Sequence, residues 1–218
     1  QKFGNIAKCF IIQDEQIEQN TQTIIKNGKI QKQPNVTTIP NPLALNFYVL
    51  GYDFRKNLIA LTDTVKQNLR VYLSQFRILT DAINIKDAYT INIGVRFSIV
   101  TQRGFNKNEV LLRCIDAVKN HFDIDKWSIS QPIILSDIAY VISLVDGVAS
   151  VVPPEDDNPQ KQMVVVENKF KLSEGYSGHV YDLQSATKDG VIYASLDPSI
   201  FELKFPNLDI EGRVVGDI

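Results

Sequence analysis

The chain has 218 residues, of which 44% are hydrophobic and 22% are charged, and this composition is typical of one or two globular domains. Its 23 basic and 25 acidic residues give a net charge of −2, which argues against a surface built mainly to bind nucleic acid or an anionic membrane. The sequence contains no uninterrupted apolar run of about 18 residues, so we expect no membrane-spanning helix.

The beginning of the sequence shows no targeting segment. Residues 1–4 lack the apolar core of a signal peptide. Met163 is the only methionine, so the first residue is not an initiator methionine. We therefore expect the chain to be a processed product or a fragment of a longer protein.

In the N-terminal part, two strand signals flank a long polar stretch. Residues 6–12 are rich in Ile and Phe and predict a first strand, and residues 44–52 predict another, with Gly51 as a candidate bulge. Between them, residues 13–41 are dominated by Gln, Asn, Lys and Thr. This composition favours either a solvated loop or a small hairpin around Asn27-Gly28.

Three helices are predicted from apolar residues spaced by threes and fours. The first covers residues 62–75. The second begins after Asn106, whose side chain can cap it, and the third begins after Ser136 and ends at Gly147.

The clearest strand pattern lies between the first two helices. One face of this strand collects the aromatic and aliphatic residues Tyr89, Ile91, Ile93, Val95, Phe97 and Ile99. The other face collects the polar residues Thr90, Asn92, Arg96 and Ser98. This alternation predicts a sheet with one buried face and one face that is at least partly wet.

The C-terminal part reads as β-structure after a proline-rich linker at residues 153–159. Strands are predicted at residues 163–166, 177–182 and 191–194, with Asp189-Gly190 as a turn. Residues 197–206 predict a half-buried strand, because apolar residues alternate there with Glu202 and Lys204.

Together these elements predict an α+β fold with mixed, largely antiparallel sheets, about three helices and a β-rich C-terminal part. We expect three parts. Residues 1–58 form a β-rich segment with the long polar loop, residues 59–152 form an α+β module, and residues 153–218 form the linker and a β-rich C-terminal module.

No motif points to a catalytic, cofactor or metal site. Cys9 and Cys114 lie in apolar patterns, which predicts buried structural thiols rather than a disulfide. Cys114 and His121 are seven residues apart, which is not a usual zinc-ligand spacing. Ser177 and His179 share a predicted strand face, but a serine nucleophile normally lies on a turn and takes its base from elsewhere. We therefore predict no catalytic residue, no metal and no cofactor.

A candidate interface lies near the C-terminus in a segment that prolines interrupt. Its apolar residues predict either part of the core or a docking segment for a neighbouring chain. The residues are Phe201, Leu203, Phe205, Leu208 and Ile210.

The order of two segments resembles the C-terminal region of the baseplate J-like wedge proteins of contractile-tailed phages. The first segment is residues 105–123, and the second is residues 131–151, which contains Asp146-Gly147-Val148 between a helix and a strand. The predicted strand before them fits the same region, and residues 197–206 resemble the T-even type of this wedge subunit. The polar segment 13–41 departs from the shorter J-like pattern.

The resemblance implies a structural subunit of a phage tail baseplate wedge and no enzyme. Family members occur as two copies per wedge, form ring contacts between wedges around the hub and rearrange when the tail contracts. The implied partners are further copies of the chain and other wedge proteins, without nucleic acid, membrane or small-molecule substrate. The implied location is the virion, with assembly in the host cytoplasm. A protein-binding adaptor that uses residues 13–41, and a hydrolase that uses carboxylates, are the alternatives.

Overall fold

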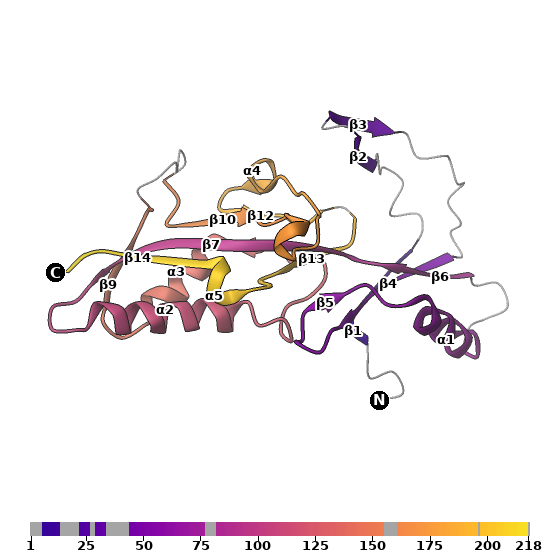
Figure 1. The fold of residues 1–218 in the computed structure, drawn as a ribbon, viewed down its shortest axis with the longest axis horizontal. Helices are drawn as coiled ribbons and strands as arrows, with labels where there is room; N and C mark the ends of the chain where they lie inside the picture. The colour runs from indigo at the N-terminus through magenta and orange to yellow at the C-terminus, as the bar shows by residue number, and fades with distance from the viewer. Residues whose placement is uncertain are drawn as a thin grey trace. The chain divides into compact units, whose positions relative to one another are not determined.

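The structure, a computed structural model, describes residues 6–13, 22–26, 29–33, 44–76, 82–154, 161–195 and 197–217 (Figure 1). The predicted fold class is confirmed: the described chain is a mixed α+β fold in which most strand pairs are antiparallel. It divides into two compact units. Unit 1 comprises Gln1–Tyr89 and Ser195–Ser199, and unit 2 comprises Thr90–Ala194 and Ile200–Ile218.

Unit 1 is built on a four-stranded sheet in which β4 pairs with every other strand. The strands β1 and β5 are antiparallel to β4, whereas β6 is parallel to it. The pairing of β1 with β4 shifts register at Gly51, so the predicted irregularity is present, but the extra residue lies in β1. The elements are β1 (Ile6–Gln13), β4 (Ala44–Tyr52), β5 (Leu58–Ile59), α1 (Asp63–Ser74) and β6 (Ala82–Asp87).

The core of unit 1 forms where α1 covers this sheet. Val49, Leu61 and Leu69 are buried together. Ile6, Val65, Leu73 and Ile85 pack around them and are partly buried. In the polar segment, β2 (Gln22–Lys26) and β3 (Lys29–Gln33) pair antiparallel, so of the two predictions for this segment the hairpin is confirmed.

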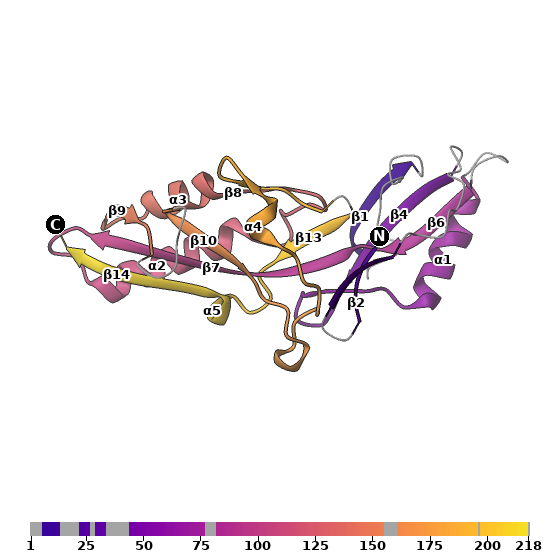
Figure 2. The same ribbon diagram turned by 90° about the horizontal axis from the view of Figure 1, so that it is seen from above.

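Unit 2 is organised around β7 (Tyr89–Thr101), the long strand predicted from alternation. β9 (Val148–Val152) and β10 (Val164–Asn168) pair with it antiparallel. β13 (Ser199–Glu202) also pairs with β7. β14 (Ile210–Asp217) runs parallel to β7, and Figure 2 shows the two strands side by side.

Helices α2 (Lys107–His121) and α3 (Leu135–Ser143) complete the core of unit 2. α2 packs on β14 and α3, and α3 packs on β9 and β10. The side chain of Asn106 caps α2 as predicted, because its Oδ1 accepts from the backbone N–H of Asn108 at 3.0 Å. The fully buried core includes Ile93, Val95, Phe97, Ile99, Cys114, Val118, Ile138, Ile142, Val164, Ile200 and Phe201.

The remaining elements of unit 2 are short. β8 (Ile133–Ile134), β11 (Thr187–Lys188) and β12 (Val191–Ile192) form a three-stranded sheet in the order β11-β12-β8. Asp189 and Gly190 both have positive φ in the turn between β11 and β12, as the sequence predicts. The others are η2 (Leu172–Glu174), α4 (Leu183–Ala186) and α5 (Pro206–Asp209).

Three local predictions were wrong. The polar face of β7 is drier than predicted, because Thr90, Asn92 and Ser98 are buried, whereas Arg96 keeps 30% of its side chain exposed. Residues 177–182 form no strand, since side-chain amides take the place of a strand partner there. Ser136 does not cap α3, which already begins at Leu135.

The chain also divides differently from the three expected parts. The boundaries predicted at 58/59 and 152/153 do not coincide with the two units, whose main division lies between Tyr89 and Thr90. The reason is that β10, β13 and β14 from the predicted C-terminal module pair with β7 from the predicted central module. Most of the predicted linker, residues 155–159, lies outside the described residues.

Candidate functional site

The predicted interface segment lies mostly inside unit 2. Phe201 is 1% exposed, and Leu203 and Ile210 are also buried. Phe205 is half-buried, with its ring centroid 5.5 Å from that of Tyr176. Leu208, on α5, is 71% exposed. Leu208 therefore offers the most surface to a partner, while the interface itself stays a prediction.

The buried polar face of β7 is the centre of a hydrogen-bond network. Asn92 is fully buried, and its Nδ2 donates to Glu202 Oε2 at 2.7 Å. Its Oδ1 accepts from the backbone N–H of Ser177 at 2.7 Å. One side chain therefore holds β13 and the segment after η2 against β7.

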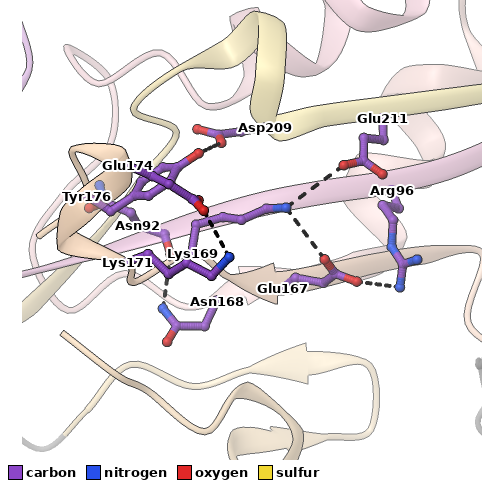
Figure 3. A network of polar contacts seen from close by, with 10 residues as sticks. All are labelled: Asn92, Arg96, Glu167, Asn168, Lys169, Lys171, Glu174, Tyr176, Asp209 and Glu211. Atoms are coloured by element: carbon purple, nitrogen blue, oxygen red, sulfur yellow. Dashed lines mark hydrogen bonds and ion pairs between the residues drawn. The ribbon is translucent and has the colours of Figure 1, made fainter. Parts of the chain in front are cut away.

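A second amide repeats this arrangement. Asn168 Nδ2 donates to the backbone carbonyl of Asn92 at 3.0 Å (Figure 3). Its Oδ1 accepts from the N–H of Tyr181 at 2.9 Å. The two amides bind the backbone of the segment 177–181 at both ends. This replaces the strand ladder that the sequence suggested, because buried N–H groups need partners.

Next to the amides, a row of charged side chains crosses three strands. Lys169 Nζ lies 3.8 Å from Glu167 Oε2 and 3.9 Å from Glu211 Oε1 (Figure 3). Glu167 also pairs with Arg96 of β7. A Cβ at Gly94 would lie 2.5 Å from Lys169 Cε, so glycine leaves the space in which the lysine stem crosses β7.

Tyr176 closes the network on the side of α5. Its hydroxyl donates to Asp209 Oδ1 at 2.6 Å, and both residues are buried. The other carboxylate oxygen of Asp209 accepts from the N–H of Phe205 at 2.8 Å. Burial, followed by the hydrogen bond to Asp209, holds the pKa of Tyr176 well above its usual range. The pair thereby fixes α5 at the beginning of β14.

The Ser177–His179 pair, weighed as half of a catalytic triad, is bound to one backbone carbonyl. Ser177 Oγ donates to the carbonyl oxygen of Thr90 at 2.7 Å. His179 Nδ1 lies 2.9 Å from the same oxygen. Since the serine proton points to the backbone and not to the imidazole, this geometry does not activate the hydroxyl.

The two cysteines have different environments. Cys114 is buried in α2, and burial raises its pKa to about 11, so at neutral pH it is an unreactive thiol. Cys9 is exposed on β1, contrary to the expectation of a buried residue. Its apolar run does not bury it, because β1 alternates between half-buried and exposed positions.

Large apolar side chains are exposed on ordered elements of both units. In unit 1 the most exposed is Phe54, at 89%, in the turn between β4 and β5. In unit 2, Leu112 on α2, Tyr140 on α3 and Leu144 at the end of α3 are all more than 60% exposed. These positions are the candidate contact surfaces of the chain.

Among the described residues, no three His, Cys, Asp or Glu side chains are grouped so that they could hold a metal ion. None of the helices in the described ranges is long and apolar enough to cross a membrane. No protein-family model matches the sequence, and no curated protein matches it.

Proposed function

We propose that the chain is a structural subunit of the baseplate wedge of a contractile phage tail. In this role it forms ring contacts between wedges around the hub and rearranges when the tail contracts. The proposal takes the family from the sequence resemblance. The structural observation that carries it is the rigid display of Phe54.

Phe54 lies on a turn that hydrogen bonds hold in one shape. Asp53 Oδ1 accepts from the backbone N–H groups of Arg55 at 2.7 Å and Asn57 at 2.8 Å. The N–H of Asp53 donates to the carbonyl of Asn57 at 2.9 Å. A phenylalanine that is 89% exposed on such a turn gains about 1.5–3 kcal/mol when a partner buries it. Because the turn is already ordered, little further entropy is lost on docking.

The positive charge beside Phe54 favours an acidic partner at this contact. The guanidinium carbon of Arg55 lies 5.1 Å from the centre of the Phe54 ring. Aromatic residues and arginine are both enriched at the centres of protein interfaces. A partner pocket with apolar walls and an acidic rim would fit this turn.

The network in unit 2 suits a mechanical role. Asn92 and Asn168 connect β7 to segments that follow it by more than 70 residues. Tyr176 joins the segment after η2 to α5. Buried networks of this kind make a unit rigid and give it one arrangement. A rigid unit moves as a body when an assembly rearranges.

The test is whether the native protein is part of a tail particle. Particles from the cells that produce the chain are separated on a density gradient, washed at high salt and analysed by mass spectrometry. We expect the chain to sediment with baseplate proteins in a fixed ratio. Its recovery only in slowly sedimenting fractions, while the tail proteins sediment fast, would refute the proposal.

The adaptor alternative predicts a different outcome. An adaptor binds its partner reversibly, so it would be lost in the high-salt wash and would show no fixed ratio to tail proteins. The same gradient therefore separates the two candidate functions.

A further inference from the structure

The outer edge of β14 is open within the described part of unit 2. β14 has eight residues and pairs with β7, and no other described strand pairs with it. It borders the sheet beside β7 in Figure 2. An open edge of this length presents backbone N–H and C=O groups to which a further strand can bond.

The side chains of β14 divide cleanly between its two faces. Glu211, Arg213 and Val215 are exposed, whereas Gly212 and Val214 are half-buried. On the covered face, a Cβ at Gly212 would lie 2.6 Å from Leu111 Cδ1 of α2. Over residues 211–215 the exposed face therefore carries one acid and one base, placed symmetrically about Gly212.

We propose that β14 pairs antiparallel with β14 of a second copy of this chain, about a twofold axis at Gly212. In this register Glu211 of each copy lies opposite Arg213 of the other, so the axis creates two opposite-charge pairs. Ile210 lies opposite Val214 on the covered face. The inference rests on the proposed function, in which copies of the chain contact one another, and it names that contact.

The charges select this register over its neighbours. A twofold axis perpendicular to the sheet keeps each residue on its own face, so the register changes in steps that centre on single residues. Centring on Glu211 would place two glutamates opposite each other, and centring on Arg213 would place two arginines opposite each other. Like charges directly opposite on neighbouring strands are destabilising, whereas opposite charges stabilise the pair.

The ion pair that Glu211 makes within one chain does not oppose this pairing. Glu211 Oε1 is 3.9 Å from Lys169 Nζ, and the Glu211 side chain remains 57% exposed. Lys169 also pairs with Glu167, so a shift of Glu211 toward a second copy leaves the lysine with an acidic partner.

The test is a charge-swap series on the full 218-residue chain, with the dissociation constant of self-association measured by sedimentation equilibrium. We expect the wild type to dimerise and Glu211→Arg and Arg213→Glu each to weaken the dimer by about tenfold or more. The double variant E211R/R213E should restore it. An equimolar mixture of the two single variants should form heterodimers, because their charges are complementary. Circular dichroism confirms that each variant is folded.

The register is tested independently by cysteine cross-linking in a Cys9→Ser background. A mixture of the Glu211→Cys and Arg213→Cys chains should form the mixed disulfide faster than either homodisulfide, because only positions 211 and 213 are opposite each other. A monomeric wild type, or single variants that dimerise as well as the wild type, would overturn the proposal. So would failure of the double variant to restore the dimer, or equal rates for all three disulfides. Failure of the β14 pairing would not overturn the proposed function, because incorporation into tail particles is measured separately.

Discussion

Asn92 and Glu202 are 110 positions apart in the sequence, yet Asn92 Nδ2 donates to Glu202 Oε2 over 2.7 Å in the interior of unit 2. The exposed fractions of the two residues are 0% and 3%. Because the second amide atom of Asn92 binds the N–H of Ser177, one side chain joins three segments of the chain. The stability of unit 2 should therefore be sensitive to this position.

Replacing Asn92 with Leu should lower the free energy of unfolding of unit 2 by about 3 kcal/mol, because Glu202 and the Ser177 N–H lose a buried partner. The only tryptophan, Trp127, is buried in unit 2, so its fluorescence during urea unfolding reports on this unit. The matched control is Asn120→Leu on the exposed side of α2, which should change stability by less than about 0.5 kcal/mol. Equal effects of the two substitutions would contradict the account.

Removing the Tyr176 hydroxyl with Tyr176→Phe should cost about 2 kcal/mol, since Asp209 keeps its burial but loses a short hydrogen bond. The variant should also change the pH dependence of stability. The pKa of Tyr176 is raised in the folded state, so its contribution is complete below the unfolded pKa of about 10 and is lost as the pH rises further. Urea titrations at several alkaline pH values should show a shallower decline for the variant, and parallel curves would refute this assignment.

Alanine substitutions at two glycines with nearly the same φ distinguish the cost of steric crowding from the cost of backbone strain. Gly147 has φ +93°, and a Cβ there would lie 2.7 Å from both Phe105 Cδ1 and Val110 Cγ2. Gly104 has φ +89° and no atom within 4 Å of that position. Gly104→Ala should cost about 1–2 kcal/mol from strain alone, and Gly147→Ala should cost about 1–3 kcal/mol more. Thermal unfolding of both variants measures the difference, and equal losses would show that the crowding at Gly147 relaxes freely.

The two thiols should react at very different rates. At pH 8, a disulfide reagent should modify exposed Cys9 in the folded chain, while buried Cys114, with a pKa of about 11, should react only after unfolding. Mass spectrometry of tryptic peptides at timed intervals identifies the modified residue. Modification of Cys114 at the rate of Cys9 in native conditions would mean that α2 opens readily.

The elements that could be predicted from the sequence are those with a regular spacing of apolar residues or a clear turn or cap signal. The strand β7, the helix α2 with its Asn106 cap, and the Asp189-Gly190 turn all follow from local spacing and turn chemistry. In each case the signal lies within a few neighbouring residues. Local patterns of this kind do not depend on what packs against them.

The polar network and β14 could not be predicted in the same way. Asn92 and Glu202 look solvent-facing by alternation, because only the later segments that cover them make them buried. β14 contains two glycines and alternates charge with small residues, which weakens its strand signal, and its parallel pairing with β7 depends on contacts far apart in sequence. Leu208 is the one member of the predicted interface set that is largely exposed, and the alternation gave no reason to separate it from Phe201.

The central claim is that neighbouring subunits cover the exposed apolar residues of this chain in an assembled tail. The most direct measurement is photo-cross-linking in purified particles, with a benzophenone amino acid at Phe54 and, as the control, at Gln67, which is exposed on α1. The account predicts that position 54 cross-links strongly to a baseplate protein or a second copy, and that position 67 does so weakly. Particles that contain the chain but give no cross-link above the control at position 54 would contradict it.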